Sequence, residues 1–352
     1  MTNGASCWTI QNYEFRPCPQ PSREFHSLVS LHTHSNHSVE KMRPLDSVMR
    51  RWFMWPLRAI VRKAFGLDRV ADLTYADLHY NPPYSPEEVL RMETDSARAL
   101  GFDSVQLAIT DHDEISGGVE LRRRRPAEAQ RIGLGEELSL HFERHLFHIG
   151  ITGLREESVA ETHAAIQAAA QERRLDDLFD LLQAARCLVV LNHPLIPWIP
   201  GNDSGEMAEK LLQRYGHAID ALEFNGMRGR KENDRVLELA RHVKKPVIGG
   251  GDSHLLLASS TICGSGADTY AEFVEEVKSG NAVPLIKHDY FAPMRWKLFL
   301  RTLHFMAHYR QIAHFRGEPV ATMLENRTVL LDPVGRMAQA FLSLTTALGL
   351  AR

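Results

Sequence analysis

The chain has 352 residues, of which 44% are apolar and 24% charged, and its formal net charge is −3. This length accommodates one large barrel or two ordinary domains, and the slightly acidic balance argues against strong nonspecific binding to nucleic acid, with short oligonucleotides left as an alternative. Four scattered cysteines without a C-x-x-C spacing argue against a disulfide framework. The beginning of the chain lacks a signal-peptide pattern, and no run approaches the roughly 20 apolar residues of a membrane span. We therefore expect a cytoplasmic protein without a transmembrane segment.

Short apolar runs alternate with helix signals over most of the chain. A helix start is clearest at Ser85, which precedes Pro86 and two acidic residues, and this helix should stop at Gly101. The alternation indicates about seven strand–helix units, an α/β architecture with a parallel sheet and the size of a TIM-type barrel. The predicted strands are 27–31, 104–109, 133–139, 145–150, 188–191, 219–224 and 246–248, and the predicted helices are 85–99, one through Leu121 that ends in Arg122 to Arg125, one or two over 155–185, 205–215 and 232–243.

An insertion at about 41–80 interrupts this alternation. A helix is predicted from Ser47 to about Leu67, with an apolar side, a basic side and a kink at Pro56. We favour packing of this helix on the body of the protein. A lid over an anionic substrate and a helix lying on a membrane surface are the alternatives.

The pattern changes again beyond residue 287. Apolar stripes predict helices at 295–315 and 337–348. We interpret residues 288–352 as an appended helical extension that packs on the barrel or forms a homo-oligomer contact, with membrane contact as the weaker alternative. The predicted barrel domain is then 1–287, including the insertion.

Metal-binding residue types stand at the ends of several predicted strands. His32 and His34 follow the first strand, and Asp252 and His254 follow the last. Residues two apart on a strand point to the same face, so each pair aims two side chains at one point. Barrel active sites lie at strand C-termini. Between the pairs stand Thr110-Asp111-His112-Asp113, Gly135-Glu136-Glu137, His145 and His148, and Asn192-His193-Pro194.

These side chains define a class of chemistry. His, Asp and Glu without Cys suit Zn²⁺, Mn²⁺ or Fe²⁺, and residue types alone do not choose among these metals. About eight ligands exceed the four of one tetrahedral site, which predicts two or three metal ions. Such centres clamp a phosphoryl group and lower the pKa of a water molecule, whose hydroxide is then the expected nucleophile. The sequence contains no G-x-S-x-G, Walker A or H-E-x-x-H motif that would indicate another mechanism.

The ordered motifs resemble those of the PHP family (polymerase and histidinol phosphatase domain) over roughly residues 27–256. The resemblance rests on His32-Thr33-His34-Ser35, Ala108 to Asp113, Gly135 to Glu137, Asn192-His193-Pro194 and Gly251 to His254. It implies a distorted (β/α)7 TIM-like barrel and a metal-dependent phosphoesterase with a di- or trinuclear centre. It also implies the metal ligands His32, His34, His112, Glu137, His148, His193, Asp252 and His254, with His145 competing with His148, and Glu137 preferred to Glu136 because one residue separates Gly and Glu in the family motif.

One position departs from the family pattern. PHP proteins usually follow the first motif with Ser-Asp-Gly, whose acid lies in or near the metal site, whereas this chain has Ser38-Val39-Glu40. The departure puts the third metal in question more than the first two. From position alone, Asp77 or His79 at the end of the insertion could replace the missing acid.

The leading functional prediction is hydrolysis of a phosphomonoester or phosphodiester of a small molecule. Asp113 is expected to orient a ligand rather than to bind metal, and Arg228, with Arg230 and Lys231 nearby, could bind a substrate phosphate. An amidohydrolase is the first alternative, but that class usually needs a bridging carboxylated lysine or an equivalent acid, and no lysine stands at a motif strand end. A non-catalytic, metal-stabilised regulatory domain is the second.

Overall fold

The computed structural model describes residues 7–41, 78–196, 204–254, 258–315, 317–319 and 331–347. The chain divides into two compact units, and each is formed by two separate stretches of sequence. Unit 1 comprises Met1–His37 and Tyr84–Met294, and unit 2 comprises Ser38–Pro83 and Arg295–Arg352. The helix expected from Ser47 to Leu67 lies outside the described residues, and the domain boundary at residue 287 stays a prediction.

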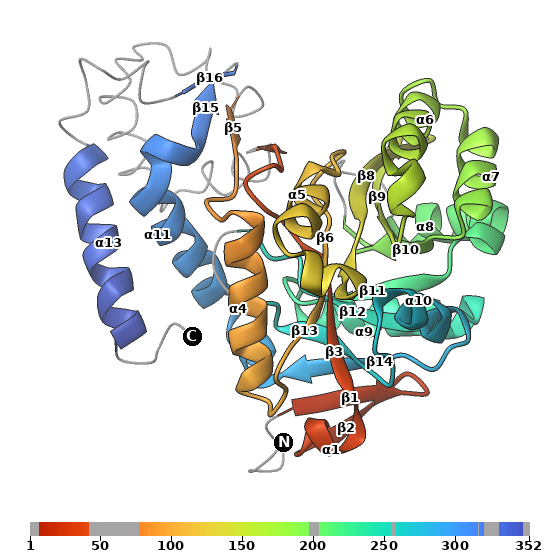
Figure 1. The fold of residues 1–352 in the computed structure, drawn as a ribbon, viewed down its shortest axis with the longest axis horizontal. Helices are drawn as coiled ribbons and strands as arrows, with labels where there is room; N and C mark the ends of the chain where they lie inside the picture. The colour runs from red at the N-terminus through yellow and green to blue at the C-terminus, as the bar shows by residue number, and fades with distance from the viewer. Residues whose placement is uncertain are drawn as a thin grey trace. The chain divides into compact units, whose positions relative to one another are not determined.

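Unit 1 is a mixed α/β structure built on two sheets (Figure 1). The strand order is β2-β1-β14-β13-β3-β6-β7 in the first sheet and β12-β11-β10-β9-β8 in the second. The strands of the first sheet are β1 (Cys7–Gln11), β2 (Glu14–Cys18), β3 (Ser27–Thr33), β6 (Gln106–Ile109), β7 (Ile132–Gly133), β13 (Thr261–Ser265) and β14 (Val283–Lys287). Those of the second are β8 (Gly135–Phe142), β9 (His145–Thr152), β10 (Leu188–Asn192), β11 (Ala221–Asn225) and β12 (Val247–Gly250).

The α/β class is as predicted, but the expectation of a purely parallel sheet is wrong. β3 pairs with β6 in parallel, and β11 pairs in parallel with both of its neighbours. β9, however, runs antiparallel to β8 and to β10. Only Glu143 and Arg144 separate β8 from β9, and a two-residue connection makes a hairpin, since a parallel pair needs a crossover of a dozen or more residues. Among the described residues of unit 1 the strands form two open sheets and no closed barrel.

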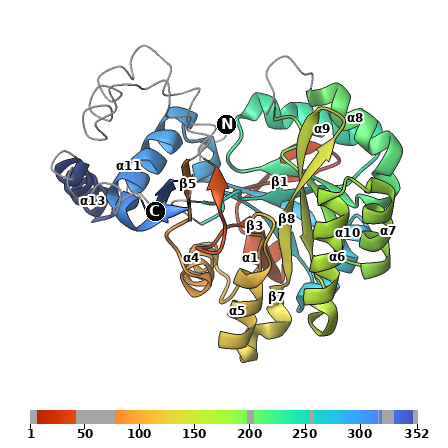
Figure 2. The ribbon, with the colours of Figure 1, turned by 90° about the horizontal axis from the view of Figure 1, so that it is seen from above.

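Helices lie around the outside of the two sheets of unit 1 (Figure 2). α4 begins as expected, because the Ser85 hydroxyl accepts a hydrogen bond from the Glu88 backbone while the Glu88 carboxylate accepts one from the Ser85 backbone. The helices are α1 (Pro21–Glu24), α4 (Pro86–Arg98), α5 (Ser116–Arg124), α6 (Val159–Gln171), α7 (Leu175–Ala185), α8 (Ser204–Tyr215), α9 (Arg230–Val243) and α10 (Tyr270–Lys278), with short 3-10 turns at Pro126–Arg131, Glu156–Ser158, Gly216–Ala218 and His288–Phe291.

Buried side chains pack against both faces of the sheets of unit 1. All five residues of β10 are buried, which is typical of a strand with packed layers on both sides. The four cysteines are free thiols and are buried in the structure. No disulfide therefore contributes to the described fold, and burial of apolar side chains dominates its stability.

Unit 2 contains a small antiparallel sheet of order β16-β15-β5-β4 and two helices. The helix expected over 295–315 ends at Ile312, because its last three residues form β15, which pairs with β5. No described helix is long and apolar enough to cross a membrane. The elements are β4 (Glu40–Lys41), β5 (Leu78–Tyr80), α11 (Met294–Ile312), β15 (Ala313–Phe315), β16 (Glu318–Pro319) and α13 (Leu331–Ala347).

Candidate metal centre

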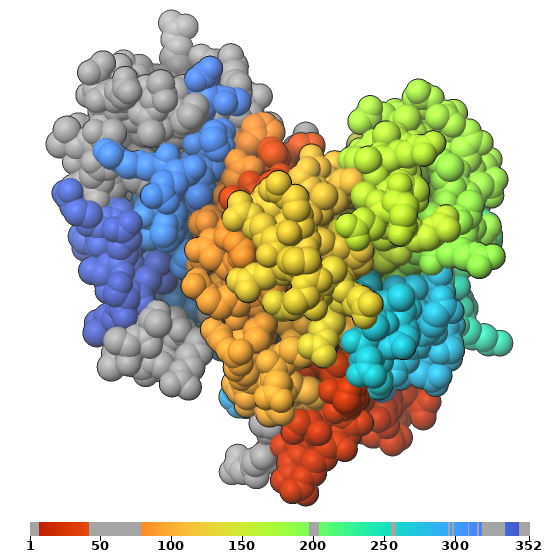
Figure 3. Space-filling model, in the orientation of Figure 1, coloured from red at the N-terminus to blue at the C-terminus, as the bar shows by residue number. Residues whose placement is uncertain are grey.

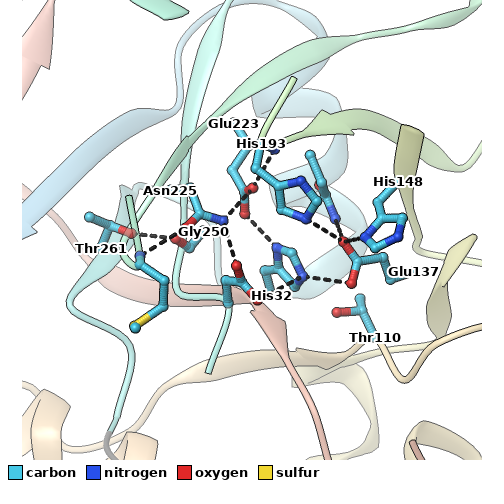
Figure 4. A network of polar contacts seen from close by, with 12 residues as sticks. His32, Thr110, Glu137, His148, His193, Glu223, Asn225, Gly250 and Thr261 are labelled. Carbon is cyan, nitrogen blue, oxygen red and sulfur yellow. Dashed lines mark hydrogen bonds and ion pairs between the residues drawn. The ribbon is translucent and has the colours of Figure 1, made fainter. Parts of the chain in front are cut away.

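Eight acidic and histidine side chains from six strands, or from the residues that follow them, meet within unit 1. Figure 4 shows the contacts that His32, His148 and His193 make with Glu137. The eight side chains are those of the residues predicted as ligands. They fall into overlapping sets, and within each set the potential ligand atoms lie no more than 4.8 Å apart. The members of these sets that belong to unit 1 are His32, Glu137 and His193; His32, His34 and Asp252; His112, Glu137 and His148; and His34, His112 and His254.

The carboxylate of Glu137 lies at the centre of this cluster and is almost fully buried. Five imidazole nitrogens approach its two oxygens. Asn192 Nδ2 also donates a hydrogen bond of 3.0 Å to Oε1. The nitrogens are His32 Nε2 at 3.1 Å, His34 Nε2 at 3.4 Å and His112 Nδ1 at 3.4 Å from Oε2, and His148 Nδ1 at 3.3 Å and His193 Nε2 at 3.1 Å from Oε1.

Strand alternation decides which members of each motif reach the cluster. On β8, Glu137 faces the cluster, whereas Glu136 points to the other side, where His163 Nδ1 lies 3.0 Å and Gln167 Nε2 2.6 Å away. On β9, His148 faces the cluster, and His145, three residues earlier, packs against the Phe147 ring on the opposite face. The geometry therefore brings Glu137 and His148 to the cluster, and not Glu136 or His145.

Two isolated parallel bridges connect the sheets at the cluster. Thr33, between the two histidines of the first motif, pairs with Ser253, and His112 pairs with Glu137. The Asp111 carboxylate reinforces the first motif, because it accepts hydrogen bonds from the Ser35 backbone at 2.6 Å and from the Ser35 hydroxyl at 2.7 Å. The first and last motifs are thus neighbours in space, although about 220 residues separate them.

Glu223, at the end of β11, holds residues of the cluster in place through its two carboxylate oxygens. Its Oε1 lies 2.6 Å from His32 Nδ1, and its Oε2 accepts hydrogen bonds from the His193 backbone at 2.9 Å and from Asn225 Nδ2 at 2.8 Å. Asn225 Nδ2 also lies 3.2 Å from Asp252 Oδ2. The predicted strand 219–224 ends at these residues, and the sequence motifs predict no role for them. The signal was present, since a buried acid at a strand end beside ligand motifs is the usual way to orient a metal-binding histidine.

Burial and neighbouring charges shift the pKa values of the histidines and carboxylates of the cluster. Burial alone would lower the pKa of His32, but the carboxylates of Glu137 and Glu223 raise it well above its usual range. Burial opposes ionisation of Glu137, yet His32, His148 and His112 hold its pKa well below the usual range. Burial lowers the pKa of His148 to about 4. The site therefore keeps Glu137 ionised and His148 neutral, which are the forms that bind metal.

A test of fit for a metal ion comes from two buried atoms that make no hydrogen bond. Because Glu223 engages Nδ1 of His32, the lone pair of a neutral His32 is left on Nε2. That atom and Glu137 Oε2 are both buried without a hydrogen-bond partner, and they face each other at 3.1 Å. A lone pair opposite a carboxylate oxygen is repulsive unless a cation, either a proton or a metal ion, lies between them. The residues present fit a metal ion.

The two residues expected to serve catalysis lie in different surroundings. Asp113 is exposed, and its Oδ1 accepts a hydrogen bond of 2.7 Å from the Ser139 backbone. Arg228 lies at the edge of the cluster, with Nη2 3.8 Å from Asp252 Oδ2. Arg230, in contrast, stacks on Phe15 and pairs with Asp234. Of the two arginines, only Arg228 contacts the cluster.

The departure from the family motif falls in unit 2. Val39 is exposed, and His79 lies on β5 opposite Lys41 and His314. Asp77 lies outside the described residues. The substitution of the missing acid by either residue stays a prediction.

No family model matches the chain, and no curated protein matches it. Several solved structures are similar to it, among them these three. An amidohydrolase from Chromobacterium violaceum, solved with bound sulfate and no metal, is 18% identical, with 49% of this chain and 83% of its own covered and a TM-score of 0.38. A predicted metal-dependent phosphoesterase from Bifidobacterium adolescentis is 17% identical, with 56% and 92% covered and a TM-score of 0.38. A two-domain protein from Bacteroides vulgatus, containing a predicted PHP-like metal-dependent phosphoesterase, is 11% identical, with 75% and 65% covered and a TM-score of 0.44.

The last of these names the family that the sequence motifs resemble. Similarity at this level says nothing about substrate or ligands, which depend on the geometry of the cluster itself.

Proposed function

We propose that this chain is a metal-dependent hydrolase that binds two or three divalent ions, Zn²⁺, Mn²⁺ or Fe²⁺, and cleaves a phosphate ester of a small molecule. The observation that carries the proposal is the convergence of five imidazole nitrogens on one buried carboxylate at 3.1–3.4 Å. Ligands at 2.0–2.1 Å from a tetrahedral ion lie about 3.3 Å from one another. The spacing therefore suits ligands that share metal ions, and the eight donors exceed the needs of one.

We assign the ligand role to the eight residues of the cluster. Glu137 belongs to two of the sets, and so does His32, which suits a centre whose ions share ligands. The donors are hard to borderline nitrogen and oxygen atoms, and this composition selects a class of metals but no single one. The proposed ligands are His32, His34, His112, Glu137, His148, His193, Asp252 and His254.

The finer fold proposal is a distorted (β/α)7 barrel around this centre. Its strands would be β3, β6, β7 continued by β8, then β9, β10, β11 and β12. The two bridges between the sheets support this arrangement, because one joins Ser253, three residues after the end of β12, to β3 and the other joins His112, three residues after the end of β6, to β8. Both bridges lie next to proposed ligands, so closure of the barrel and assembly of the centre would be one event.

The chain's own residues would perform distinct tasks around the substrate. Bound ions would supply the positive charge that activates a water molecule and neutralises the oxygens of the ester. Glu223 holds the ring of His32. Asp113 fixes β8, since it accepts from the Ser139 backbone while its own backbone donates to the Glu137 carbonyl at 3.0 Å. Arg228, half-buried beside Asp252, would bind a substrate phosphate.

The position of the buried lysine favours a phosphate ester over an amide as the substrate. Bridging by a carboxylated lysine needs a lysine amine within the cluster. The buried lysine that the structure describes, Lys287, instead donates to the Ser96 hydroxyl at 2.6 Å. A cationic Arg228 at the rim suits an anionic substrate.

The test is hydrolysis of a panel of phosphomonoesters, phosphodiesters, amides and lactones after loading with each metal. We expect phosphate esters alone to react, and Arg228→Ala to raise KM about tenfold or more, in line with the loss of a charge-assisted hydrogen bond. Arg230→Ala is the matched control and should leave KM unchanged. Turnover of amides with inert phosphate esters would refute the proposal, and equal KM values in both variants would refute the role of Arg228.

A further inference from the structure

Large apolar side chains are exposed on one surface of unit 2. Met337, Phe341 and Leu344 of α13 are 72%, 38% and 55% exposed, and their spacing of four and three residues places them on one stripe of the helix. The Phe299 ring of α11, also exposed, lies 5.9 Å from that of Phe341. Trp296 stacks on Phe299 at 5.5 Å. We call these five side chains the apolar patch, and Figure 3 shows α13 at the surface.

The same unit carries a net basic charge, although the chain as a whole is slightly acidic. Over the ranges that define unit 2, 16 Lys and Arg stand against 8 Asp and Glu, a net charge of +8. Unit 1 has 25 basic and 36 acidic residues, a net charge of −11. α11, which contributes Trp296 and Phe299 to the patch, holds four basic residues and no acidic one. The overall net charge of −3 is therefore the sum of an acidic unit 1 and a basic unit 2.

We propose that unit 2 is a peripheral membrane-binding module whose apolar patch inserts into the surface of an anionic bilayer. Exposed Phe, Leu and Met with a half-buried Trp, beside the basic helix α11, match the composition of interfacial helices, which lie in the headgroup region and do not span the bilayer. The net charge of +8 complements the negative potential of an anionic leaflet. The inference is independent of the chemistry proposed for unit 1.

The positive charge of unit 2, together with its apolar patch, favours an anionic bilayer over other partners. A symmetric dimer through the apolar patch would bring two units of charge +8 together, and that repulsion opposes the contact. Nucleic acid would satisfy the basic charge but would leave Met337 and Leu344 exposed to water, since phosphates offer no apolar surface. An anionic lipid surface satisfies both features.

The experiment is co-sedimentation of the full-length protein with vesicles of phosphatidylcholine, with or without about a third of phosphatidylserine. We expect binding to the anionic vesicles, weakened by added salt, and weak binding to the neutral ones. The double variant Phe341→Ser with Leu344→Ser should lose at least about tenfold in partitioning. Phe341→Leu, which keeps an apolar side chain, should retain binding and shows whether the loss is specific. Val119→Ser removes an exposed apolar side chain from unit 1 and should change nothing.

Three results would overturn the proposal. Equal partitioning of the wild type and the double serine variant would exclude the apolar patch as the contact. Absence of binding to anionic vesicles would exclude the bilayer. A dimer in light scattering that the double variant dissociates would assign the patch to a second copy of the chain.

Discussion

Glu223 shows how one side chain outside the proposed ligand set can control it. It holds the His32 ring at Nδ1 and the backbone of His193 through its two oxygens. An amide at this position would keep an acceptor but would lose the charge that favours the Nδ1–H form of His32.

We predict that Glu223→Gln lowers metal affinity by about 10- to 100-fold, the range typical for loss of a carboxylate behind a histidine ligand. The measurement is competition with a chromogenic chelator. Glu238→Gln, on the exposed side of α9, is the matched control and should bind as tightly as the wild type. Unchanged metal affinity in Glu223→Gln would show that Glu223 does not control the proposed ligands.

The two histidines of β9 give a second prediction at the level of the residue. His148 faces Glu137, whereas His145 packs on Phe147 on the other side of the strand. His148→Ala should therefore lower the metal content of the purified protein. His145→Ala should keep the metal content and lose only stability, because it leaves a cavity in the core. The opposite pattern of metal contents would mean that His145 is the ligand.

At the level of elements, the close packing of strand ends fixes the ligand geometry. Gly250 ends β12 directly beside Glu223, and a Cβ at this position would overlap the Glu223 carboxylate. The neighbouring strands β11 and β12 pair Asn225 with Gly250, so neither strand can move away alone. The absence of a side chain at Gly250 is thus a condition for the placement of Glu223.

We predict that Gly250→Ala displaces Glu223 and lowers metal affinity about tenfold or more, although it alters no proposed ligand. Gly229, at the start of α9, has no atom within 4 Å of such a Cβ. Gly229→Ala should therefore bind metal normally. Competition with a chelator measures the metal affinity of both variants. Equal affinities would show that the packing around Glu223 can relax.

Local patterns predict the strands that carry the proposed ligands, because apolar runs followed by His, Asp or Glu are visible within ten residues. The choice between His145 and His148 needed the strand alternation that the structure supplies. The sheet of unit 2 could not be predicted, because its strands have two or three residues and pair Tyr80 with Ala313. Strands that short carry no periodicity, and their pairing depends on the tertiary fold. The antiparallel pairing of β9 with β8 follows from the two-residue turn between them, which the strand–helix alternation of the sequence does not distinguish from a longer connection.

At the level of the whole molecule, a buried cluster of this kind couples metal binding to stability. Six of the eight residues of the cluster are more than nine-tenths buried, and Nε2 of His32 faces the Glu137 carboxylate at 3.1 Å, a contact that needs a proton or a metal ion between the two atoms. Metal bound only by the folded chain raises its stability by mass action. The central claim thus concerns a property of the purified protein that requires no knowledge of its substrate.

The most direct measurement is the metal content per chain, determined by elemental analysis of the wild type and of His193→Ala, with circular dichroism as a check of the fold. We predict about two or three transition-metal ions per wild-type chain and the loss of at least one in the folded variant, because His193 contributes Nε2 beside Glu137. A wild-type protein that binds no transition metal after incubation with Zn²⁺, Mn²⁺ or Fe²⁺, or a variant with undiminished metal content, would contradict the assignment of this cluster as a metal centre.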